Sequence, residues 1–170
     1  ETELLMKIIY KSKSPSFIRL GKCPDKDFYN KNVKLKNGHG LVVSAGKDMT
    51  IFTSGNILEN VFKAVEKVKD KGFNIKLISL PIMKPINNKF VLANFDSKKI
   101  LSIEESSLIG GLSSILPSIY FKKPKKNIQF KSIALRDIVH KSIGSQKYLR
   151  NKNMLSSEKI YKFIIKYLNE

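Results

Sequence analysis

Apolar runs alternate with amphipathic segments along most of the chain. Short runs rich in β-branched residues, leucine and phenylalanine, bounded by glycine, proline, asparagine or serine, are typical of strands. They predict strands at residues 40–44, 49–53, 73–80, 99–103 and 128–134. Helical spacing of apolar residues or local capping signals predict helices between and after them, at residues 56–71, 87–94, 107–119 and 156–168.

The order of these elements predicts the fold class. Strands that alternate with helices indicate a mostly parallel sheet that is covered on both faces. The first two strands are an exception, because only Ala45-Gly46-Lys47-Asp48 separates them and a tight turn there favours an antiparallel pair. We therefore predict an α/β fold, a three-layer sandwich with a five-stranded, mostly parallel sheet and one antiparallel strand.

Polar side chains mark the expected helix ends. Asn56 and Glu59 have the spacing of a capping box at the start of the first long helix. Ser107 is expected to cap the helix that follows the fourth strand. Pro117 lies inside that helix, and we expect it to kink the helix or end its regular hydrogen bonding.

The first 38 residues are predicted to lie outside this sheet. An apolar stripe in ETELLMKIIY predicts a short helix, and a turn at Ser14-Pro15 leads into a predicted strand at residues 16–20. Residues 22–38 are polar and turn-rich, which favours a linker, so the main domain is expected at residues 39–170. The opening has no signal-peptide pattern and reads like the middle of a longer sequence.

The net charge of +18 suggests an anionic partner, but its distribution argues against nucleic acid. Only three of the 32 basic residues are arginine, and the lysines are scattered along the chain. The densest run, Lys122-Lys123-Pro124-Lys125-Lys126, has one aromatic neighbour on its N-terminal side, whereas nucleic-acid surfaces usually combine arginine with stacked aromatic rings. The single cysteine, Cys23, fits a reducing compartment, so a cytoplasmic location is expected.

Four motifs in sequence order resemble the transketolase family. The segment PSFIRLGK, at residues 15–22, is similar to the P-V-Y-L-R-L-G-R of the strand that closes its pyrimidine-binding domain. MTIFTSGN, at residues 49–56, resembles the opening strand and turn of its C-terminal domain. ISLPIMKPI, at residues 78–86, and IEESSLIGGL, at residues 103–112, are similar to its V-S-M-P-x-x-K-P and V-E-E-H-x-x-x-G-G-L-G. Deoxyxylulose-phosphate synthase and the beta subunits of 2-oxoacid dehydrogenases share these motifs.

The resemblance implies a domain organisation and a function. Residues 1–21 would be the last helix and strand of the pyrimidine-binding domain, residues 22–38 the linker, and residues 39–170 the transketolase C-terminal-like domain. The chain would be a fragment or split subunit of an enzyme that transfers a two-carbon ketol unit between sugar phosphates. It would have no catalytic residue of its own, and it would pack on the cofactor-binding and pyrimidine-binding domains of a homodimeric parent enzyme.

The cofactors that the resemblance implies, thiamine diphosphate and Mg²⁺, would bind to regions absent from this chain. The family binds them with a Gly-Asp-Gly…Asn motif and an activating glutamate, and the sequence has neither. The alternative, from a different class, is a stand-alone basic binding module for an anionic partner such as nucleic acid. Steep salt dependence of binding to arbitrary DNA would favour that alternative.

The site residues that the resemblance implies are Lys22 and Arg19, at the edge of the substrate channel, where a cation holds the substrate phosphate. Ser106 stands where many members have histidine, and Ser113 replaces the third glycine of G-G-L-G.

The spacing of the other polar residues in the sequence favours structural roles for them. Adjacent Glu104 and Glu105 at a strand end point in opposite directions, so we expect one of them to cap the following helix rather than both to form an acid–base pair. His39 and His140 lack partners at metal-ligand spacing, and Cys23 has no evident base.

Overall fold

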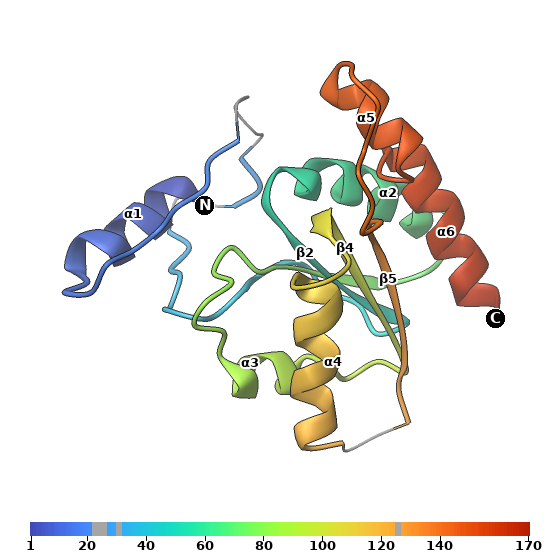
Figure 1. Cartoon of the computed structure of the whole chain (residues 1–170). Coiled ribbons are helices and arrows are strands. Elements are labelled where there is room, and N and C mark those ends of the chain that lie inside the picture. The colour runs from blue at the N-terminus through green and yellow to red at the C-terminus, as the bar shows by residue number, and fades with distance from the viewer. Residues whose placement is uncertain (22–26, 30–31, 125–126) are drawn as a thin grey trace.

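A five-stranded sheet forms the centre of the described chain (Figure 1). Its strand order is β1-β3-β2-β4-β5. The computed structural model describes residues 1–21, 27–29, 32–124 and 127–170. β1 is antiparallel to β3, and the other neighbouring strands are parallel. This confirms the predicted α/β class and its mostly parallel sheet with one antiparallel strand. The strands are β1 Leu41–Ser44, β2 Met49–Ser54, β3 Ile75–Ser79, β4 Lys99–Ser107 and β5 Gln129–Leu135.

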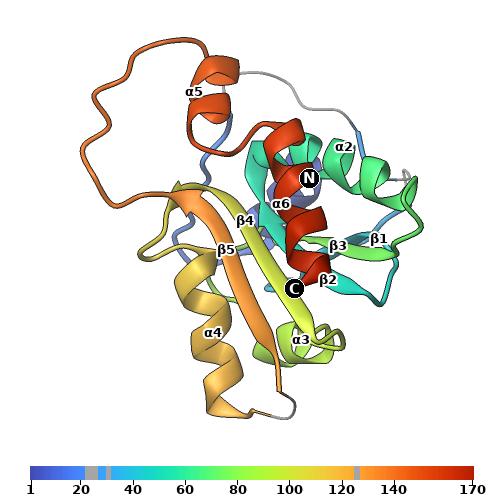
Figure 2. The ribbon, with the colours of Figure 1, turned by 90° about the vertical axis from the view of Figure 1, so that its right-hand side faces the viewer.

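Helices cover both faces of the sheet and complete the three layers. α2 and α6 pack together over one face, around a core that includes Ile51 and Leu77. α3 and α4 cover the other face, around a core that includes Phe52 and Ile78. Figure 2 shows α4 and α6 on opposite sides of β4 and β5. These helices are α2 Leu58–Lys69, α3 Asn88–Ala93, α4 Leu112–Lys122 and α6 Ser157–Asn169.

The predicted hairpin between the first two strands is wrong, because β1 pairs with β3 and not with β2. The connecting residues cross the start of β3 instead of closing a tight turn. The backbone amides of Lys47 and Asp48 both donate to the Asn74 carbonyl, and the Asp48 carboxylate accepts from the Asn74 amide. Gly46 permits this crossing, since a Cβ there would lie 2.4 Å from the Ile75 carbonyl carbon.

Two predicted helix starts are also wrong. Asn56 lies inside a 3-10 turn, η1 Gly55–Ile57, so α2 begins at Leu58 without a side-chain cap. Ser107 is the last residue of β4 rather than a helix cap, and α4 begins five residues later at Leu112. α4 does not end at Pro117, because its buried face continues beyond the proline to Ile119.

The N-terminal arm, residues 1–21, lies apart from the sheet (Figure 1). Its helix α1, Thr2–Lys11, has no buried residue. Residues 16–20, predicted to be a strand of a neighbouring domain, pair with no strand in the part of this chain that the structure describes. Tyr29 fixes the start of the arm by donating to Glu1 Oε1 at 2.7 Å. Burial, followed by the negative charge of Glu1, raises the pKa of Tyr29, so the phenol stays a neutral donor.

The C-terminal end of α6 is fastened to the strands by polar contacts. The Lys99 ammonium donates to the carbonyls of Tyr167 and Leu168 at 2.7 and 2.8 Å, where the helix dipole favours a cation. The buried Tyr167 hydroxyl donates to the Gln129 carbonyl at 2.7 Å. Burial and then the negative charge of Glu170 raise the pKa of Tyr167 to about 12.

Tyr167→Phe is expected to lower the free energy of unfolding by about 1 kcal/mol at pH 8, because the Gln129 carbonyl loses its hydroxyl partner. The native state favours the protonated phenol, whose pKa is about 10 in unfolded chains. The contribution of Tyr167 is therefore fully present below pH 10 and is lost as pH rises from about 10 to about 12. Urea unfolding of both proteins at pH 8 and pH 11 checks this, and a difference between them that does not shrink at pH 11 contradicts it.

Candidate functional site

The parallel strands all end at one edge of the sheet, and this carboxyl edge is the candidate site. The chain leaves β2 for α2 on one face and leaves β4 for α4 on the other face. In open α/β sheets, ligands bind at the carboxyl edge where the strand order reverses, and here the chain passes from β2 to β3 on one side and from β4 to β5 on the other. Here that position lies between the end of β2, at Ser54, and the end of β4, at Ser107.

Glu104 in β4 organises this edge, and its side chain is only 2% exposed. Its Oε2 accepts from the Leu112 amide at 2.8 Å and from the Ser106 hydroxyl at 2.6 Å. Its Oε1 accepts from the amide and the hydroxyl of Ser113, at 2.8 and 2.7 Å. The carboxylate thus satisfies two of the free N–H groups at the start of α4, where the helix dipole also favours negative charge. This confirms the structural role predicted for one member of the Glu104-Glu105 pair.

Glu105 points to the opposite face and binds Arg150, as alternation along a strand requires. The guanidinium donates from Nε to Oε1 at 2.9 Å and from Nη2 to Oε2 at 2.6 Å, which is a bidentate pair. Arg150 belongs to α5, Gln146–Lys152, a helix that the sequence pattern did not predict. The pair joins α5 to the end of β4, and none of the residues of α5 is buried.

Arg150→Ala is expected to free α5 and to lower the free energy of unfolding by about 1–2 kcal/mol, because it leaves the partly buried Glu105 without its partner. Arg150→Lys keeps the charge but loses the two parallel hydrogen bonds, so it should recover only part of the loss. Hydrogen exchange of the α5 amides checks this against Lys147→Ala, an exposed position on the same helix. Equal exchange in both alanine variants would show that the pair does not hold α5.

The N-terminal arm reaches this edge at the end of β2. Gly21 lies against Asn56, and a Cβ on Gly21 would be 1.9 Å from the Asn56 side-chain nitrogen. Arg19 is exposed and only two residues before Gly21, so its Cα lies within about 7 Å of the Gly21 Cα. Lys22, the other predicted phosphate-binding residue, lies outside the described residues. The sequence contained no local signal for the contact between Gly21 and Asn56, because the two residues are 35 positions apart.

No metal centre is formed by the residues that the structure describes, since nowhere among them do three or more His, Cys, Asp or Glu side chains come together. His39 packs against Phe90, with ring centroids 5.1 Å apart and the rings tilted by 51°, and His140 Nε2 lies 3.2 Å from the Arg136 carbonyl oxygen. Cys23 lies outside the described residues. None of the described helices is long and apolar enough to cross a membrane.

Comparison with known proteins identifies relatives of the main domain. The family described as "Transketolase, C-terminal domain" matches residues 38–160. "Transketolase" of Homo sapiens is 27% identical over 127 residues, which cover 72% of this chain and 20% of that protein. "1-deoxy-D-xylulose-5-phosphate synthase" of Shouchella clausii is 31% identical over 114 residues, which cover 65% of this chain and 18% of that protein. The chain thus spans less than half the length of these curated relatives.

A solved structure extends the likeness to the N-terminal arm. The protein titled "Split gene transketolase, inactive beta4 tetramer" superposes with a TM-score of 0.87 at 22% identity. The match covers 99% of this chain and 55% of that one. At this identity the likeness shows the fold alone.

Proposed function

The chain belongs to the transketolase C-terminal domain family, and from this premise we propose that it is the C-terminal part of a thiamine-diphosphate-dependent transferase. That enzyme would move a two-carbon ketol unit between sugar phosphates, and this chain would be a piece of it or a split subunit. The observation that carries the proposal is the family match across residues 38–160. The alternative, a stand-alone basic module, finds no support in these comparisons.

Thiamine diphosphate and Mg²⁺ are proposed to bind to other parts of the enzyme. The cofactor, when bound, supplies the chemistry that breaks and makes the carbon–carbon bond, while the protein binds and orients it. Residues of this chain do not fit that role, because the sequence lacks the Gly-Asp-Gly…Asn motif and the described part has no cluster of metal ligands. The proposed contribution of the chain is therefore to packing and to the edge of the channel.

The N-terminal arm is the proposed contact with the pyrimidine-binding domain. It exposes four large apolar side chains, which is typical of an interface rather than of a free surface. These are Met6, Tyr10, Phe17 and Leu20. We propose that residues 1–21 complete the pyrimidine-binding domain and that residues 22–38 link it to the main domain. The cofactor-binding domain is the other proposed partner, in a cytoplasmic, homodimeric enzyme.

Arg19 and Lys22 are proposed to hold the phosphate of the substrate. The close approach of Gly21 to Asn56 supports this, because it brings Gly21, which is two residues after Arg19, to the carboxyl edge of β2. An ammonium or guanidinium group binds phosphate through charge-assisted hydrogen bonds, and an arginine can do so with two parallel bonds. Asn56 and Gly21 position the segment, and neither is proposed to react.

Lys22→Ala is expected to raise the KM of the assembled enzyme for a sugar phosphate by about 10- to 100-fold, the range of one lost charge-assisted hydrogen bond. The matched control is Lys13→Ala, an exposed lysine of the same arm. With a non-phosphorylated sugar, Lys22→Ala and the wild type should have the same KM. A KM raised equally for both sugars would show a general defect and would contradict phosphate binding.

Reconstitution tests the function itself. Ketol transfer is expected when this chain is combined with the cofactor-binding and pyrimidine-binding domains of its enzyme, and no transfer is expected from the chain alone. Deleting the arm, residues 1–21, should abolish the association while the main domain stays folded by circular dichroism. Undiminished transfer after this deletion would contradict the role proposed for the arm.

A further inference from the structure

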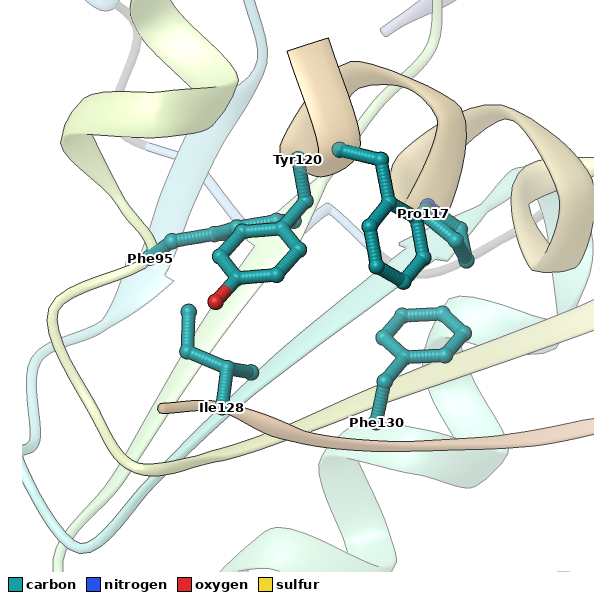
Figure 3. Close-up of a pocket in the computed structure, with 6 residues that line it drawn as sticks. Phe95, Pro117, Tyr120, Ile128 and Phe130 are labelled. Atoms are coloured by element: carbon teal, nitrogen blue, oxygen red, sulfur yellow. The ribbon is translucent and has the colours of Figure 1, made fainter. Parts of the chain in front are cut away.

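A hollow lined by aromatic and aliphatic side chains opens at the opposite, amino edge of the sheet (Figure 3). It has two adjoining parts, of about 50 and 120 Å³, which share Phe95, Tyr120 and Ile128. Phe130 and Pro117 line the narrower part, which is the one of about 50 Å³; the part of about 120 Å³ is the wider one. The candidate site described above, with Gly21, Asn56 and Glu104, lies at the other end of the strands, so this hollow is separate from it.

A series of ring contacts forms one wall of the hollow. Phe52 meets Phe95 edge-on with centroids 5.5 Å apart, Phe95 meets Tyr120 at 5.9 Å, and Tyr120 meets Phe121 edge-on at 5.5 Å. Phe52 is fully buried in the core, whereas Phe121 is 74% exposed, so the series runs from the core to the surface. Rings packed in this way present faces and edges on which a further ring can stack.

The size of the wider part suits one six-membered ring. An apolar cavity of about 150 Å³ in another protein takes up benzene. The wider part of this hollow, at about 120 Å³, is comparable in size. Leu92 and Ala93 of α3 line its remaining wall and supply aliphatic contacts.

Charge at the opening favours an anion. Lys123 lines the wider part, and it follows Lys122 directly. Asp96 lines it as well, but its carboxylate pairs with the Lys76 ammonium and accepts from the Thr50 hydroxyl at 3.3 Å. With Asp96 neutralised by Lys76 and a net charge of +18 on the chain, the local field attracts negative groups.

We propose that this hollow binds a single-ring aromatic anion. The ring lies against Phe95, Tyr120 and Ile128, and the carboxylate or phosphate group faces Lys123. Burial of the ring gives the affinity, and the ion pair at the opening selects the sign of the charge.

The test uses four small probes on the ¹⁵N-labelled full chain: benzoate, benzyl alcohol, benzylamine and acetate. Benzoate is expected to bind with a Kd of about 1–10 mM, as its size allows. It should shift the amides of Ala93, Phe95 and Ile128. Benzyl alcohol should bind more weakly at the same place, and benzylamine more weakly still. A stronger shift with benzylamine, or the same pattern of shifts with acetate, would overturn the proposal.

Two substitutions test separately what the hollow and what the charge of Lys123 contribute to binding. Ile128→Trp fills the hollow and should abolish the benzoate shifts. Lys123→Gln leaves the hollow intact and should raise the benzoate Kd by about two- to fivefold, as expected for one exposed ion pair. Lys71→Gln, an exposed lysine just after α2, is the matched control and should leave the Kd unchanged. If Ile128→Trp fails to fold, Lys123→Gln still tests the proposal. A benzoate Kd equal to that of Lys71→Gln would contradict the role of Lys123.

Discussion

Replacing Glu104 with alanine is expected to lower the free energy of unfolding by about 3–5 kcal/mol, because it removes a buried charge that four donors surround. The side chain is 2% exposed and accepts four hydrogen bonds. Its loss leaves the amides of Leu112 and Ser113 without an acceptor at the start of α4. Two partly buried hydroxyl groups, of Ser106 and Ser113, lose their acceptor at the same time.

Urea unfolding of three variants checks this expectation. Glu104→Gln keeps the size of the side chain but turns one accepting atom into a donor that faces other donors, so about half of the loss is expected. Glu66→Ala removes an exposed carboxylate whose partner is Lys69, and it should cost less than about 1 kcal/mol. A loss below about 1 kcal/mol for Glu104→Ala would mean that water or another acceptor replaces the carboxylate.

Replacing Gly111 with alanine is expected to cost about 2–4 kcal/mol, because the new Cβ would collide with the same carboxylate. It would lie 2.0 Å from Glu104 Oε2, and its three nearest atoms all belong to that carboxylate. The backbone of Gly111 has φ of −92°, which any residue can adopt. The requirement for glycine here comes from the close approach and not from the conformation.

A double-mutant cycle with Glu104→Ala tests this cause. Once the carboxylate is gone, Gly111→Ala should cost less than about 1 kcal/mol, so the two substitutions are strongly non-additive. Gly110→Ala is the matched control in the same loop. Its φ is +86° with open space around a new Cβ, so it should cost about 1–2 kcal/mol from strain alone, and the cost should be the same in both backgrounds. Additive costs for Gly111 and Glu104 would contradict the collision.

Both residues that depart from the family motif donate to Glu104. Ser106, at the position of the family histidine, donates to Oε2, and Ser113, at the third glycine of the motif, donates to Oε1. The two departures therefore act on one group and strengthen a cap that the backbone amides of α4 already form. This gives both serines a structural role at the start of α4.

The main elements of the fold could be predicted because their patterns are local. The apolar run at residues 73–80 contains β3, and the stripe from Ile57 to Val68 faces the core as α2. The partner of β1 could not be predicted, since it depends on the path of residues 45–48 across β3 rather than on their own turn signal. α5 has seven residues and none of them is buried, and its Arg150 contacts a residue 45 positions away, so the sequence carried no local signal for this helix.

In the candidate site, too, some features could be predicted from the sequence and others could not. The capping role of Glu104 could be predicted, because alternation along a strand and the dipole of the next helix both follow from the sequence. The position of Arg19 could not be predicted, since it depends on the contact between Gly21 and Asn56. Residues 16–20 pair with no strand of the five-stranded sheet, as expected for a segment that the sequence assigns to a neighbouring domain.

Calorimetric titration with thiamine diphosphate and Mg²⁺ tests the proposed function most directly. It is run on this chain alone, and then on the chain assembled with the cofactor-binding and pyrimidine-binding domains of its enzyme. No heat of binding is expected from the chain alone, and saturable binding is expected from the assembly. Binding by the chain alone would place the cofactor site within these 170 residues, and no binding by the assembly would remove the transketolase-like function altogether.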